Sequence, residues 1–73
     1  MDEKDKKERF NKIAENRTNK ILEMLRLLGN CSNTSNYSYT DEEVKRIFST
    51  IESEIKEQKA KFERKDKKKK FSL

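Results

Sequence analysis

Apolar residues recur along two segments of this chain at the three- and four-residue spacing that places them on one helix face. The first segment is bounded by Gly29, which follows its last apolar residue at a position where a left-handed glycine often caps a helix. Arg17 is a charged residue within the same face. The pattern predicts a helix over about residues 5 to 28. Its apolar face, the first stripe, comprises Phe10, Ile13, Ala14, Ile21, Met24, Leu25 and Leu28.

The second segment begins with a strong helix-start pattern. Thr40 and Glu43 have the spacing of a capping box, in which each side chain accepts a hydrogen bond from the backbone of the other residue. Acidic residues at 41 to 43 also complement the positive end of a helix dipole. We therefore expect a helix that starts at Asp41 and ends near Arg64. Its face, the second stripe, comprises Val44, Phe48, Ile51, Ile55, Gln58 and Phe62.

Between the two segments lies an uncharged connector, residues 29 to 40, that is rich in asparagine and serine. These side chains compete with the backbone for hydrogen bonds and so favour turns over helix. The connector is longer than most links between bundle helices, and long ordered loops are often functional. The expected organisation is a charged extension at 1–9, a helical hairpin at 10–64 and a basic tail at 65–73.

An all-α fold follows, an antiparallel two-helix hairpin that self-associates into a helical bundle. A chain of 73 residues with one cysteine has no disulfide framework to stabilise its small core. The apolar surface is also extended beyond the stripes by Leu22, Leu27, Tyr37 and Ile47, more than one partner helix covers. The residues expected in the oligomer core are Phe10, Ile13, Ile21, Leu25, Leu28, Phe48, Ile51, Ile55 and Phe62.

Arg17 has two interpretations in such a bundle. Antiparallel packing sets Leu28 opposite Val44 and Phe10 opposite Phe62, which brings Arg17 near Ile55. In one interpretation its stem covers the core while its guanidinium reaches water. In the other it points into the oligomer core and pairs with an acid or a bound anion, because an unpaired buried charge is very costly.

Charge is abundant, with 45% charged residues, 30% hydrophobic residues and a net charge of +5. Most of the positive excess lies in the tail, which either binds phosphates through counterion release or simply keeps the protein soluble. The candidate nucleic-acid contacts there are Lys67, Lys68, Lys69 and Lys70.

A second candidate site is the connector with the arginines around it, which offer guanidiniums, amides and aromatic faces of the kind that clamp phosphates and stack on bases. Its residues are Arg17, Asn19, Arg26, Asn30, Asn33, Asn36, Tyr37, Tyr39 and Arg46. The alternative is a loop whose polar side chains bond its own backbone. The acidic residues that begin the second helix oppose an anion there, so an anion site depends on the arginines.

Catalytic chemistry finds little support in these residue types. The chain has no histidine, which is the commonest general base and transition-metal ligand, and Cys31 therefore lacks an activating partner. We expect no enzyme activity, no metal and no cofactor. Neither a signal peptide nor a run of apolar residues long enough for a bilayer is present, which predicts a cytoplasmic protein without membrane contact.

The segments ENRTNKILEMLRLLGN and SNYSYTDEEVKRIF resemble small helical-hairpin proteins encoded by phages and mobile elements of low-GC Gram-positive bacteria. The resemblance implies a bacterial host cytoplasm and a protein that acts stoichiometrically, often in counter-defence. The resulting hypothesis is a self-assembling accessory protein that binds an anionic ligand, either a nucleotide signal or a nucleic acid. One alternative is an inhibitor of a host defence enzyme such as a CRISPR nuclease, and another is a DNA-associated factor that uses the basic tail.

Overall fold

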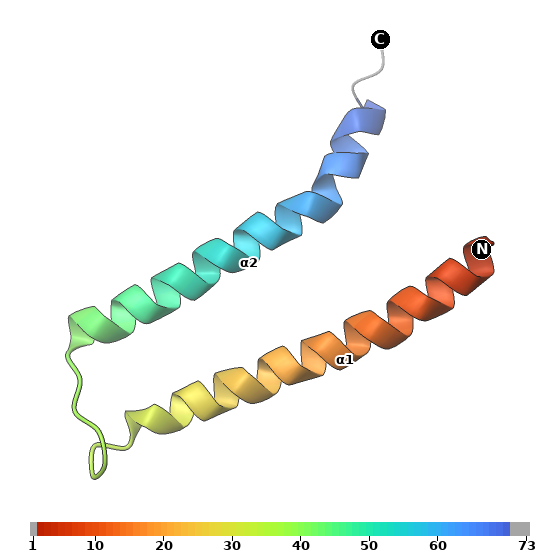
Figure 1. The fold of residues 1–73 in the computed structure, drawn as a ribbon. Coiled ribbons are helices and arrows are strands. Elements are labelled where there is room, and N and C mark those ends of the chain that lie inside the picture. The colour runs from red at the N-terminus through yellow and green to blue at the C-terminus, as the bar shows by residue number, and fades with distance from the viewer. Residues whose placement is uncertain (1, 71–73) are drawn as a thin grey trace. The chain divides into compact units, whose positions relative to one another are not determined.

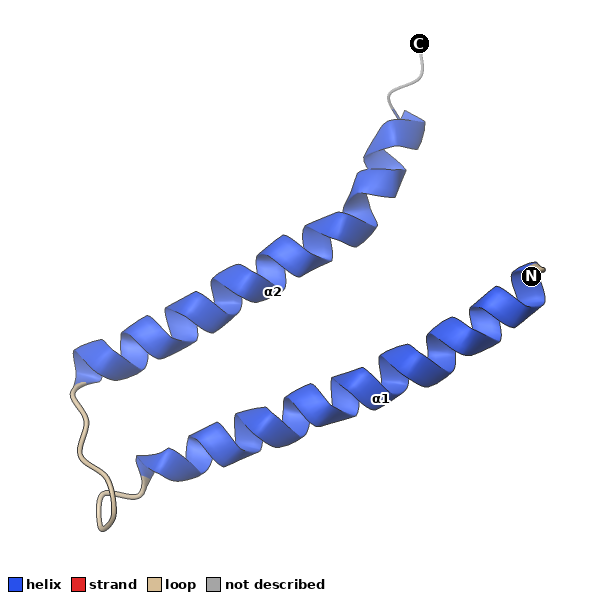
Figure 2. Ribbon diagram, in the orientation of Figure 1, coloured by secondary structure: helices blue, strands red, loops and turns tan. Residues whose placement is uncertain are grey.

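A computed structural model describes the backbone of residues 2–70 and the side chains of residues 2–63. Helix α1 spans Glu3–Gly29, a short 3₁₀ helix η1 spans Asn30–Ser32, and helix α2 spans Asp41–Lys70 (Figure 1). The part of the chain so described contains helix and loop but no strand (Figure 2). The prediction of an all-α protein is confirmed. The chain divides into two units, Met1–Ser38 and Tyr39–Leu73.

Helix α1 begins two residues earlier than the sequence pattern indicates, at Glu3 instead of about residue 5. Asp2 is its N-cap: the side-chain Oδ1 accepts the backbone N–H of Asp5 at 2.9 Å. Lys6 donates its N–H to the Asp2 carbonyl at 3.1 Å. Asp2 thus satisfies the Asp5 amide, which the first turn leaves without a helical partner, and its carbonyl accepts the first intrahelical bond of α1.

The end of α1 corrects one prediction. Gly29 has φ −59° and ψ −30°, which is ordinary right-handed helix, so it is not a left-handed cap. The chain instead tightens into η1, and the N–H of Asn30 donates to carbonyls of the last turn, including that of Arg26. Such tightened bonds satisfy the terminal carbonyls without a residue at positive φ.

The start of α2 is as predicted. The N–H of Thr40 donates to Glu43 Oε1 at 2.8 Å, and the N–H of Glu43 donates to Thr40 Oγ1 at 3.1 Å. The first intrahelical bond follows, from the N–H of Val44 to the carbonyl of Thr40 at 3.2 Å. The capping box is complete, and Asp41 is the first helical residue.

The end of α2 differs from the prediction, because the helix continues past Arg64 to Lys70. The lysine run, predicted as a separate basic tail, therefore has a helical backbone up to Lys70. Lysine is a good helix former, and basic residues are favoured near the negative end of the helix dipole. The phosphate-binding prediction for Lys67 to Lys70 concerns side chains that lie outside the described residues.

Both apolar stripes are laid out along their helices as predicted, and none of the side chains described at 2–63 is buried. Leu25 and Leu28 on α1, with Val44 and Ile51 on α2, are half-buried by their own helical neighbours. Ile21 and Ile55 remain 58% and 54% exposed. Within residues 2–70 neither helix is apolar enough over sufficient length to cross a membrane.

Candidate functional site

The connector is organised around Asn33. Its side-chain Oδ1 accepts the N–H of Ser35 at 2.9 Å, and its carbonyl accepts the N–H groups of Asn36 at 3.2 Å and Tyr37 at 3.0 Å. This is the local side-chain-to-backbone bonding that builds an Asx turn. Asn33 therefore has a structural role, which supports the interpretation of the connector as a loop that bonds its own backbone.

Other predicted ligand residues of the first unit present exposed side chains near the end of α1. Arg26 lies in the last turn, Asn30 opens η1 and accepts the N–H of Asn33 at 3.3 Å through its carbonyl, and Tyr37 is 52% exposed. Arg26, Asn30 and Tyr37 are thus brought to one end of this unit by η1 and the Asn33 turn. Their guanidinium, amide and phenol groups can bind phosphate and stack on a base.

Arg17 and Asn19 are exposed on the middle of α1, about two and a half and about two helical turns before Arg26 respectively. The local structure does not bring them to the connector end of their own unit. Whether the Arg17 guanidinium reaches water or pairs with an acid or anion in an oligomer core therefore depends on the helix that packs against the first stripe.

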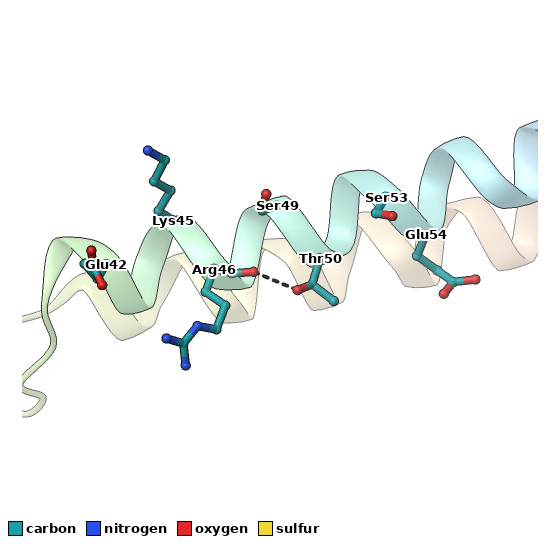
Figure 3. A pocket seen from close by; sticks show the side chains of 7 residues that line it. All are labelled: Glu42, Lys45, Arg46, Ser49, Thr50, Ser53 and Glu54. Carbon is teal, nitrogen blue, oxygen red and sulfur yellow. Dashed lines mark hydrogen bonds between the residues drawn. The ribbon is translucent and has the colours of Figure 1, made fainter.

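The second unit contains a shallow depression along one side of α2, which Figure 3 shows with its side chains. Arg46, a predicted ligand residue, is one of its lining residues, and its carbonyl accepts the hydroxyl of Thr50 at 2.8 Å. In this view the side chains of Lys45 and Arg46 extend to opposite sides of the helix. The lining residues are Glu42, Lys45, Arg46, Ser49, Thr50, Ser53 and Glu54.

The chemistry of this depression is mixed. Its two basic side chains are matched by two carboxylates, so no net positive charge is concentrated there. The hydroxyls of Ser49, Thr50 and Ser53 add neutral hydrogen-bonding groups that our sequence analysis did not select. A row of small polar residues at helical spacing on the side away from the stripe was the available indication. Tyr39, also a predicted ligand residue, is 40% exposed just before this helix.

A polar contact beside the second stripe was also missed. The side chain of Gln58 donates from Nε2 to Glu54 Oε2 at 2.6 Å, across one helical turn. Gln58 belongs to the stripe, so the bond holds a carboxylate next to the apolar face. The four-residue spacing of glutamate and glutamine is the sequence feature that predicts such a pair.

Two further kinds of site are groups of residues that bind a metal and residues that act through a thiol. Among the residues described, no three His, Cys, Asp or Glu side chains gather as a metal site. Cys31 is an exposed free thiol whose Sγ donates a long, weak bond to the carbonyl of Leu27 at 3.9 Å.

Comparison of the chain with protein-family models, with curated proteins and with solved structures gives no match. Its class is therefore given by its own architecture, two amphipathic helices joined by a polar connector.

Proposed function

We propose that the chain is a non-catalytic accessory protein, a helical hairpin that self-associates through its two stripes and binds an anionic ligand at its connector end. The observation that carries the proposal is the row of large apolar side chains along each helix, exemplified by Ile21 at 58% and Ile55 at 54% exposure. Burying such side chains is worth about 1.5–3 kcal/mol each, which is the largest stabilising contribution this chain has to offer.

The spacing of the stripes is compatible with an antiparallel hairpin. Along the centre of the first stripe, positions 10, 14, 17, 21, 24 and 28 are separated alternately by four and three residues. The second stripe, at positions 44, 48, 51, 55, 58 and 62, has the same order of steps. The sequence of steps reads the same from either end of a stripe. In an antiparallel pair, each central residue of one stripe therefore lies opposite a central residue of the other, and each such pair forms one layer. Alternating steps of this kind are the heptad pattern of packed helices.

The polar interruptions of the stripes are compatible with this register. Arg17 faces the layer of Ile55 in the hairpin, close to the carboxylate of Glu54, which Gln58 holds at 2.6 Å. An arginine paired with a carboxylate that is already hydrogen-bonded avoids the cost of an unpaired buried charge. A polar layer of this type also disfavours a slipped register, since slipping moves Arg17 away from Glu54 and leaves its charge without that carboxylate.

The ligand component of the proposal is supported by the groups at the connector end. Arg26 and Tyr37 are exposed, and the Asn33 turn fixes the backbone next to Tyr37 at 3.0 Å. An exposed aromatic ring and an arginine at one end of the unit suit a nucleotide, whose base and phosphate need those two kinds of contact. The mixed charge of the depression on α2 makes that surface the weaker candidate.

The self-association is tested with two substitutions on opposite sides of α2. Ile55→Lys places a charge in the second stripe, and we expect it to raise the dissociation constant of the assembly about thirtyfold or more, from the lost burial of isoleucine alone. Ser53→Lys adds the same charge on the opposite face and should leave the assembly unchanged. Light scattering across a concentration series measures both variants.

Two results of this test contradict the proposal. One is a wild-type chain that remains monomeric at every concentration yet melts cooperatively. The other is equal weakening by both lysine substitutions, which attributes the effect to net charge instead of the stripe.

A further inference from the structure

The central positions of each stripe are flanked by two rows of residues that recur every seventh position and so run along the helix. On α1 these rows include Ile13 and Leu25, which belong to the sides of the first stripe. On α2 one row contains Lys45, Glu52 and Lys59, and the other contains Ile47, Glu54 and Lys61. On α1 the corresponding rows are Asn11, Thr18 and Leu25, and Ile13, Lys20 and Leu27. We name the rows that start at Asn11 and Lys45 the outer edges, and the rows that start at Ile13 and Ile47 the inner edges.

In a four-helix bundle one edge of each helix faces its neighbour in the hairpin, while the other edge faces a helix of the second copy. The inner edges are complementary within the hairpin. At the register given above, Leu27 meets Ile47, Lys20 meets Glu54 and Ile13 lies along the stem of Lys61, so the edges form one apolar pair and one pair of opposite charges and bring no like charges together. The outer edges are then left for the second copy.

We propose that a second copy of this chain docks on the outer edges, so that α1 of one copy lies beside α2 of the other. This inference rests on the proposed self-association and specifies its arrangement. Thr18 then faces Glu52 of the second copy, Asn11 faces its Lys59, and Leu25 lies along the stem of its Lys45. No like charges meet, and Leu25, which is half-buried by its own helix, gains further cover.

The competing arrangement puts α2 beside α2 of the second copy. In that arrangement the outer edge of one α2 faces the outer edge of the other α2 only when the two helices run antiparallel. If the two stripes also overlap along their full length, Glu52 faces Glu52 of the second copy, and Lys45 faces its Lys59. Like charges in such flanking positions disfavour a pairing and are a common means of selecting partners. A shift of one α2 by seven residues along the other relieves this repulsion, but it leaves seven residues of each stripe uncovered. The arrangement with α1 of one copy beside α2 of the other is therefore favoured.

Cross-linking between differently labelled chains tests the arrangement. In a Cys31→Ser background, chains with Thr18→Cys and chains with Glu52→Cys are unfolded together, refolded and treated with a short bis-maleimide. We expect cross-linked dimers only in the mixture, up to about half of all dimers, which is the statistical share of mixed pairs. Neither variant should form cross-links alone.

A matched pair on the inner edges is the control. Chains with Lys20→Cys mixed with chains carrying Glu54→Cys should yield no interchain product, because those residues meet within one hairpin. If either outer-edge variant fails to assemble, the pair Asn11→Cys and Lys59→Cys probes the same edges.

The outcomes separate this inference from the self-association itself. Cross-linking of Glu52→Cys with itself, or an interchain product from the inner edges, overturns the arrangement while leaving self-association intact. Absence of every product from chains that light scattering shows to be assembled also overturns it. A monomeric Cys31→Ser parent refutes both, because no interface then exists.

Discussion

Individual residues in the connector divide into those that build the loop and those that the loop presents. Asn33 belongs to the first group, with its side chain and carbonyl accepting three backbone N–H groups. Arg26 and Tyr37 belong to the second, since their side chains are exposed while their backbones are fixed by η1 and the turn. A ligand that stacks on an aromatic ring benefits from this division, because less side-chain and loop ordering accompanies binding.

The residues assigned to the ligand can be tested by melting shifts with cyclic and linear nucleotides and short single-stranded oligonucleotides as probes. We expect Arg26→Ala and Tyr37→Ala each to remove the shift, with a loss of about 1–3 kcal/mol for the stacked tyrosine. Both variants should retain the helicity and assembly of the wild type.

Arg9→Ala provides the control for this experiment, because it removes the same guanidinium from the opposite end of α1. Its ligand shift should equal that of the wild type. A shift that survives both connector substitutions, or no shift from any probe on the wild-type chain, contradicts the ligand component of the proposal.

At the level of the elements, the sequence predicts the first residue of α2 correctly but places the first residue of α1 too late. The start of α2 is specified by Thr40 and Glu43, whose capping box is the bonding pattern found at 2.8 and 3.1 Å. The start of α1 was placed too late because Asp2 lies within a charged run, where one capping aspartate resembles its neighbours. Helix ends were harder still, since neither Gly29 nor the lysines after Arg64 impose a stop by themselves.

The capping box should contribute measurably to stability. Thr40→Ala removes the oxygen that accepts the Glu43 N–H, so we expect a loss of about 1 kcal/mol in the free energy of unfolding. Thr50→Ala is the same chemical change inside the helix, where the hydroxyl only bonds the Arg46 carbonyl at 2.8 Å. That variant should keep or slightly gain stability. Chemical denaturation followed by circular dichroism compares the two, and equal losses would argue against the cap.

The candidate site shows the same limit of sequence-based prediction. Residue types identified Arg26, Tyr37 and Arg46 as chemically suitable, and the connector composition identified a turn. Sequence did not distinguish the structural role of Asn33 from a ligand role, because an amide can bond either backbone or ligand with equal ease. Nor did it find the bond from Gln58 to Glu54, which depends on the side-chain conformations of both residues.

For the molecule as a whole, stability and assembly should be inseparable. Every side chain described at 2–63 retains exposure in its own unit, so the apolar surface of the stripes stabilises the fold only as other helices cover it. Packing between copies makes the folded fraction depend on how much protein is present.

Melting at several protein concentrations tests this coupling. If folding and dimerisation occur together, the apparent melting temperature should rise by on the order of 10 °C for a hundredfold increase in concentration. Circular dichroism at a helix band gives the measurement. A melting temperature that does not change with concentration would indicate a hairpin that is stable alone.

The right-handed conformation of Gly29 has a consequence for the connector end. A Cβ atom added there meets nothing within 4 Å, so neither backbone geometry nor space demands a glycine. In a helical conformation glycine is less favourable than alanine by about 1 kcal/mol, which makes the last turn of α1 intrinsically weak. This is the turn that carries Arg26 and leads into the Asn33 loop. Fraying is therefore easiest beside the proposed ligand site, and a nucleotide that binds there has to offset the cost of ordering this turn.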